Sequence, residues 1–283
     1  MSLGREETRE LIRSSDLLID SSPVGGGMVR NDSISVSTPF IHWQNRNAPI
    51  ISRSSNWDEN YSTIYELDVS NEGLPFMGYL EGKLFGVSAR IFRISFSGEL
   101  AYEINVPSDY GMFMWEKIIE IGEEFNMQPY GTEALSTLRI EMGHVAGSEL
   151  DGRTIPYDNS LEGLLSKKKD FIGKRSLSRE AFTANDRQKV VGVVPIDKKT
   201  SIPEGSHLVK DANAPLPNPK LGYISASCWS VEYDNPFSLA ILKNGKDMIG
   251  EKLFVMSPLK NKIIPVEIVS SHYVDPKGER VRS

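Results

Sequence analysis

The chain has 283 residues, of which 39% are hydrophobic, and it carries a net charge of −6 with a pI near 5.4. This composition can fill one large core or two of ordinary size, and the acidic balance argues against a nucleic-acid partner, which requires a basic face. The single cysteine, Cys228, excludes an internal disulfide and a cysteine-based metal cluster. No apolar run is long enough to span a membrane, so we expect a cytoplasmic protein. The four histidines are scattered, with no pair at three- or four-residue spacing, so we expect no metal site.

The first 66 residues show little periodic pattern. We expect a short charged helix from Arg5 to Leu18. The stretch from Ser21 to Asn60 is rich in Ser, Asn, Gly and Pro, which favours turns. Its triple glycine, Gly25 to Gly27, lacks the following residues and the spacing of a phosphate-binding loop. We therefore assign no chemistry to this segment.

Regular structure is expected from Lys83 onward. Apolar residues alternate along one face of a strand that ends near Ile94, namely Phe85, Val87, Ala89 and Ile91. Ser97 and Gly98 supply a turn into a second strand, which predicts a hairpin.

The second strand carries Glu103. The two-residue period places Leu100, Tyr102, Ile104 and Val106 on a core face, and Ala101, Glu103 and Asn105 on the opposite face. A carboxylate on a rigid strand can accept two N–H donors from a flat heterocycle. The alternative is an ordinary solvated glutamate.

Two helices follow. Ser108 and Asp109 are expected to cap the first, whose inward stripe is Met114, Trp115, Ile118, Gly122 and Phe125. The second starts at Thr132, packs Leu135, Leu138 and Met142 inward, and ends at Gly143. Glu133 suits the first turn of this helix even without a ligand. Arg139 and Glu141 flank the packing face, where a simple surface pair is one interpretation.

A basic run, Lys167, Lys168 and Lys169, follows the polar turn from Glu149 to Asp158, and Arg175 comes soon after. A solvated loop is the ordinary interpretation of such a run, and a binding patch is the sharper one. Beyond Arg187, short strand-like runs separated by Gly, Pro and Asn predict a small antiparallel barrel or sandwich. We place a domain boundary near Ala184 to Arg187.

Three motifs, "SFSGELAYEINVPSDYG", "PYGTEALSTLRIEMG" and "SKKKDFIGKRSL", occur in this order. The chain from about Leu67 to Arg280 thereby resembles the folate-binding glycine-cleavage T-protein (aminomethyltransferase) family, and in particular the C-terminal part of the heterotetrameric sarcosine oxidase alpha subunit. The resemblance implies an α+β folate-binding domain over 67–185, truncated at its N-terminal side, and a C-terminal β-barrel over 186–283, after a poorly matched segment 1–66.

The resemblance also implies tetrahydrofolate as the cofactor and a small amine as substrate. Glu103 would accept pterin N–H groups, with Tyr102 buttressing the strand. Glu133 and Arg139 would line the pocket, and Lys167 and Lys168 would meet the glutamate tail of folate or a partner subunit. Flavin-dependent amine oxidase subunits are possible partners, because the chain has no dinucleotide fingerprint of its own.

Departures from the family pattern keep a second hypothesis open. No residue matches the family's catalytic aspartate, a folate-contacting arginine aligns near Leu135, and a tryptophan is replaced by Gly163. Catalytic residues are therefore unknown, and whether the chain is an enzyme is left open. The alternative is a non-catalytic interaction subunit or degenerate relative that keeps the scaffold for partner contact.

Overall fold

The computed structural model describes residues 17–20, 41–43, 67–123, 127–184, 186–215 and 217–282. The chain forms two compact units, Met1–Leu138 with Lys277–Ser283, and Arg139–Pro276. By these contacts, residues 139–187 group with the barrel that follows them. The domain boundary expected near Ala184 to Arg187 remains a prediction.

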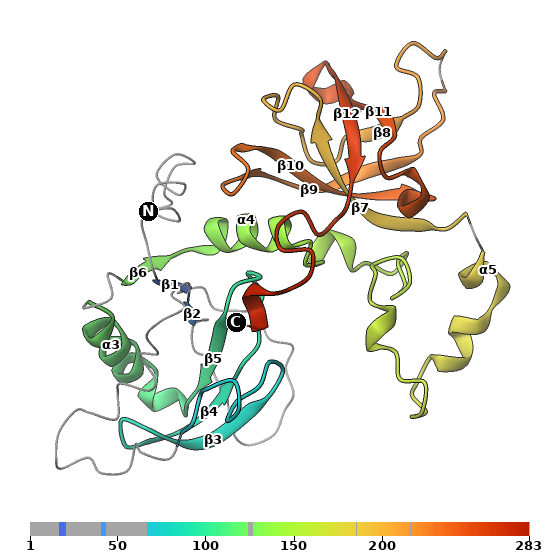
Figure 1. Cartoon of the computed structure of the whole chain (residues 1–283). Helices are drawn as coiled ribbons and strands as arrows, with labels where there is room; N and C mark the ends of the chain where they lie inside the picture. The colour runs from blue at the N-terminus through green and yellow to red at the C-terminus, as the bar shows by residue number, and fades with distance from the viewer. Residues whose placement is uncertain are drawn as a thin grey trace. The chain divides into compact units, whose positions relative to one another are not determined.

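The first unit contains a mixed six-stranded sheet in the order β3-β4-β5-β2-β1-β6 (Figure 1). Its strands are β1 (Leu17–Asp20), β2 (Ile41–Trp43), β3 (Tyr79–Leu84), β4 (Val87–Phe92), β5 (Ala101–Asn105) and β6 (Met127–Tyr130). β1 runs parallel to β6, and the other neighbours are antiparallel. Because Leu17 and Leu18 lie in β1, the expected helix from Arg5 to Leu18 is wrong at its end, and its other residues lie outside the described ranges.

The expected hairpin is confirmed as the pair β4–β5, but its first strand starts later than expected. Phe85 and Gly86 both have positive φ, 52° and 77°, and form the two-residue turn that joins β3 to β4. Phe85 continues the apolar alternation by sequence alone, while its backbone adopts the conformation that two-residue hairpin turns require. β3 itself was not expected.

The core of the first unit lies between the meander β3–β4–β5 and the helix α3 (Gly111–Gly122). Val87, Ala89 and Ile91 point from β4 into this core, and α3 contributes Met114, Ile118 and Ile121. The expected cap at Ser108 and Asp109 is wrong, because these residues form the 3-10 turn η2 (Ser108–Tyr110) and α3 begins after it without a side-chain cap. Phe125 lies outside the described residues.

The helix α4 (Thr132–Met142) ends where the sequence predicts. Gly143 has a φ of 81°, and the N–H of His144 donates to the Arg139 carbonyl at 2.8 Å. This is the left-handed glycine stop of a helix. A Cβ atom at position 143 would also lie 2.3 Å from the Ser271 carbonyl oxygen. Both the backbone conformation and the lack of space therefore require glycine.

The second unit ends in a closed barrel with strand order β10-β7-β12-β11-β8-β9 (Figure 1). Its strands are β7 (Gln188–Pro195), β8 (His207–Val209), β9 (Gly222–Ser230), β10 (Asn235–Lys243), β11 (Lys252–Ser257) and β12 (Lys262–Val269). Before the barrel lie the short turns η4 (Gly147–Glu149), η5 (Glu162–Leu164) and η6 (Lys174–Ser178) and the helix α5 (Glu180–Thr183). The α+β fold with a C-terminal antiparallel barrel is thus confirmed.

Candidate functional site

Glu103 lies on β5, on the face of the meander that points away from the core. Its neighbours on the strand, Tyr102 and Ile104, are buried, whereas Glu103 is only partly covered. The expected division of β5 into two faces holds at these positions. Ala101 departs from it, because this residue, expected on the open face, is only 3% exposed at the point where β2 pairs with β5.

The Glu103 carboxylate has lost part of its hydration by burial. Among the residues that the structure describes, none forms a hydrogen bond or an ion pair with it. Burial raises the pKa of Glu103 above its ordinary value of 4.5, because desolvation disfavours the charged form. A carboxylate in this position gains free energy from any ligand that donates N–H groups to it.

Tyr102 holds the strand from the core side. Its hydroxyl donates a hydrogen bond to the Val69 carbonyl at 3.2 Å, and its ring belongs to the core of the first unit. Burial raises the pKa of Tyr102, and the nearby Arg93 guanidinium opposes that shift. Tyr102 therefore holds β5 in position from the core side of the sheet.

Two aromatic residues that the sequence did not single out lie in line with Glu103. The strand register pairs Tyr79 of β3 with Phe92 of β4, and Phe92 with Glu103 of β5. The two rings are stacked, with centroids 5.6 Å apart. Phe92 could have been found from the alternation of β4, in which Ser88, Arg90 and Phe92 share the open face, whereas Tyr79 belongs to a strand that was not predicted.

Arg139 and Glu141 are not a surface pair. The Arg139 guanidinium, 12% exposed, forms an ion pair at 3.1 Å with the fully buried Glu149. Glu141 is 5% exposed and accepts a hydrogen bond from the Val231 N–H at 2.6 Å. Burial is the largest cause of the raised pKa of Glu141. Both side chains therefore point into the second unit, where each is already bonded.

The other predicted residues are solvent-exposed. Glu133 is exposed in the first turn of α4. Lys167, Lys168 and Lys169 are all exposed, and the Lys174 ammonium donates to the Lys169 carbonyl at 2.7 Å, which closes the turn beneath them. Glu103, Tyr102 and Glu133 belong to the first unit, and Arg139 and the lysine run belong to the second.

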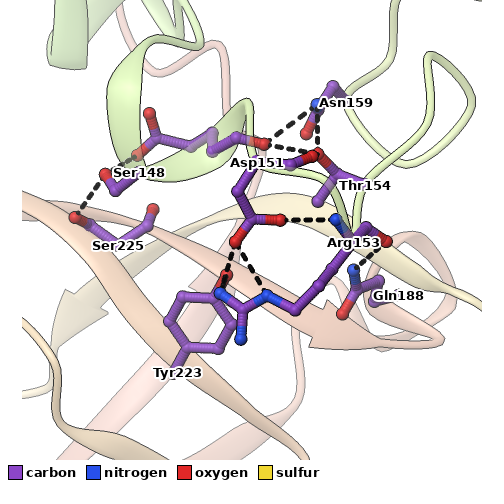
Figure 2. Close-up of polar contacts among 9 residues, drawn as sticks. Ser148, Asp151, Arg153, Thr154, Asn159, Gln188, Tyr223 and Ser225 are labelled. Atoms are coloured by element: carbon purple, nitrogen blue, oxygen red, sulfur yellow. Dashed lines mark hydrogen bonds and ion pairs between the residues drawn. The ribbon is translucent and has the colours of Figure 1, made fainter.

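Figure 2 shows a polar network in the turn after α4. The Arg153 guanidinium pairs with the Asp151 carboxylate and lies over the Tyr223 ring, 5.6 Å from its centroid. Next to this pair, the Asn159 amide donates to the Glu149 carbonyl at 3.1 Å. The Asn159 Oδ1 atom is buried and has no hydrogen-bond partner in the described part of the chain. The sequence predicted a polar turn here, but it did not indicate Tyr223 or Asn159.

The sequence model of the GCVT N-terminal domain matches residues 60–169. The sarcosine oxidase alpha subunit of Rhizobium meliloti is 41% identical over 77% of this chain. The chain belongs to the GCVT family. It spans only 22% of that alpha subunit. An aminomethyltransferase of Thermoanaerobacter pseudethanolicus is 26% identical over 80% of this chain and 67% of its own length.

A solved structure supports the fold of this GCVT-family chain. The aminomethyltransferase T of the glycine cleavage system from Bartonella henselae superposes with a TM-score of 0.63. The match covers 84% of this chain and 60% of that protein, at 18% identity. In the described ranges of the chain, no group of three or more His, Cys, Asp or Glu could hold a metal ion. Within the same ranges, no helix has the length and apolar character needed to cross a membrane.

Proposed function

We propose that this chain binds tetrahydrofolate through Glu103 and serves one-carbon transfer from a methylated or aminomethyl amine to that cofactor. The observation that carries the proposal is the half-buried Glu103 carboxylate, which lacks a partner among the described residues and has a raised pKa. Membership of the GCVT family supports folate as the ligand. Tetrahydrofolate would supply the nitrogen atoms that take up the carbon unit, and Glu103 would hold and orient its pterin ring.

The test is calorimetric titration of the intact chain with tetrahydrofolate. We expect micromolar affinity for the wild type and a loss of about 1.5–3 kcal/mol for Glu103→Gln, because the variant replaces a charged acceptor by a neutral amide. Asn105→Asp is a matched control, since position 105 lies on the same face of β5. Equal affinities of wild type and Glu103→Gln would remove Glu103 from the site.

A second candidate function is contact with a partner subunit without folate chemistry. It is favoured by the segment around the lysine run, where Leu164 is 75% exposed and Ile172 is fully exposed. Large apolar side chains exposed close together are typical of protein interaction sites. The partners would be subunits of a flavin-dependent amine oxidase. The same titration separates the two candidates, because an interaction subunit should give no heat with tetrahydrofolate.

A further inference from the structure

Tyr79, Phe92 and Glu103 form a single row across three strands. The register pairs the first with the second and the second with the third. Directly paired residues of antiparallel strands project from the same face of a sheet. That face is the open one, because Val87, Ala89 and Ile91 of β4 are the buried residues.

In the strand register Phe92 lies between Tyr79 and Glu103, with the Glu103 strand on one side of it. Tyr79 stacks on the other side of Phe92, with an angle of 27° between the ring planes. Neighbouring strands lie about 4.8 Å apart, which is close to the spacing of stacked rings. A flat ring placed above Glu103 would therefore extend the stack by one member, with its edge toward the carboxylate.

This row has two unmet requirements. Tyr79 is 60% exposed, and neither it nor Phe92 belongs to a core cluster of the described residues. The Glu103 carboxylate lacks a donor in the same part of the chain. A purely apolar occupant would cover the rings and leave the acceptor unpaired, at a cost in free energy. A flat heterocycle with N–H groups along one edge meets both requirements.

We propose that Phe92, supported by Tyr79, is the stacking wall against which the pterin ring lies while Glu103 accepts its N–H groups. This inference rests on the proposed folate function and adds to it two residues that select for a flat ring. It also assigns an order of importance: Phe92 contacts the ligand, and Tyr79 acts through Phe92 as a positioning residue.

The experiment compares tetrahydrofolate, a tetrahydropterin without the side chain, and p-aminobenzoylglutamate as calorimetric ligands of the intact chain. Phe92→Leu keeps an apolar side chain but removes the ring. We expect this variant to bind tetrahydrofolate and tetrahydropterin with affinities that are both lower by about fivefold or more, as for bases stacked on aromatic residues. Affinity for p-aminobenzoylglutamate should not change. Tyr110→Ala, which removes an exposed aromatic residue from η2, is the control and should bind as the wild type.

The outcomes separate the two proposals. If the wild type binds no tetrahydrofolate, the proposed function fails and this inference fails with it. If Glu103→Gln weakens binding and Phe92→Leu does not, the stacking wall is overturned while the folate function stands. As a measurement that needs no variant, tetrahydropterin should shift the ring proton resonances of Phe92 in the wild type. Unchanged resonances at saturating ligand would contradict the proposal.

Discussion

At the scale of single residues, the proposed folate site centres on a carboxylate whose partial burial disfavours its charged form. Glu103 lies on a strand between the buried Tyr102 and Ile104, and its own side chain is partly covered. Such an arrangement lowers stability in exchange for a prepared acceptor, as at other functional sites.

The raised pKa of Glu103 predicts how binding depends on pH. The folded state takes up a proton at a higher pH than the ordinary value of 4.5, and only the ionised form can accept N–H donors on both oxygens. Affinity for tetrahydrofolate should therefore fall as the pH decreases through the raised pKa. Glu103→Gln should remove this dependence, which calorimetry at several pH values will measure. A wild-type profile parallel to that of the variant would contradict the assignment.

The raised pKa of Glu103 also determines how this residue's contribution to stability changes with pH. Between 4.5 and the raised pKa the folded state binds more protons than the unfolded state, so the contribution of Glu103 to stability decreases as the pH rises through that window. At neutral pH, Glu103→Gln should stabilise the unliganded chain by about 0.5 kcal/mol, while it lowers the affinity for tetrahydrofolate. Urea unfolding measures the first effect, and a destabilised variant would show that Glu103 has a structural partner.

At the scale of elements, the last turn of α4 is bonded to distant parts of the second unit. Arg139 reaches Glu149, and Glu141 accepts N–H groups of Val231 and Glu232 in the turn between β9 and β10. These contacts explain why a helix end with two charged residues is buried. They also bring the polar turn of Figure 2 against β9, where Ser148 donates to the Ser225 carbonyl at 2.9 Å.

The ion pair Arg139–Glu149 gives an element-scale prediction. Arg139→Met removes the cation that pairs with the fully buried Glu149 carboxylate, which keeps the hydrogen bonds from the Ala146 N–H and the Ser148 hydroxyl. The loss should cost about 3–5 kcal/mol of unfolding free energy. The double variant Arg139→Met with Glu149→Met should recover much of this loss, because it removes both charges. Urea unfolding of the three proteins is the measurement. If the double variant is no more stable than the single one, the loss comes from packing around Arg139.

At the scale of the whole molecule, charge is unevenly distributed. The chain has a net charge of −6, yet Ser166–Arg179 holds six basic residues and one acidic residue. Lys167, Lys168 and Lys169 are exposed, so each contact they make with an anion is weak and screened by salt. Their joint effect depends on the number of negative charges on the ligand.

Replacing Lys167, Lys168 and Lys169 together with Gln tests this distribution. Affinity for a polyglutamylated folate should fall several-fold at low salt, while monoglutamyl folate should bind nearly as before, and added salt should erase the difference. Calorimetry at two salt concentrations is the measurement. Equal weakening of both ligands would place the lysines at the pterin, and no change would favour a solvated loop or a subunit contact.

The sequence by itself determined the features that depend on neighbours along the chain. The two-residue period identified β4 and β5, and short strand-like runs separated by Gly, Pro and Asn indicated the barrel. Gly143 marked the end of α4 because one backbone conformation requires glycine there. Only the tertiary structure decided which strands pair, and pairing is what places Phe92 beside Glu103 and Tyr79 beside Phe92. It likewise turned Arg139 from a surface residue into half of a buried ion pair, because desolvation and pairing depend on groups far away in the sequence.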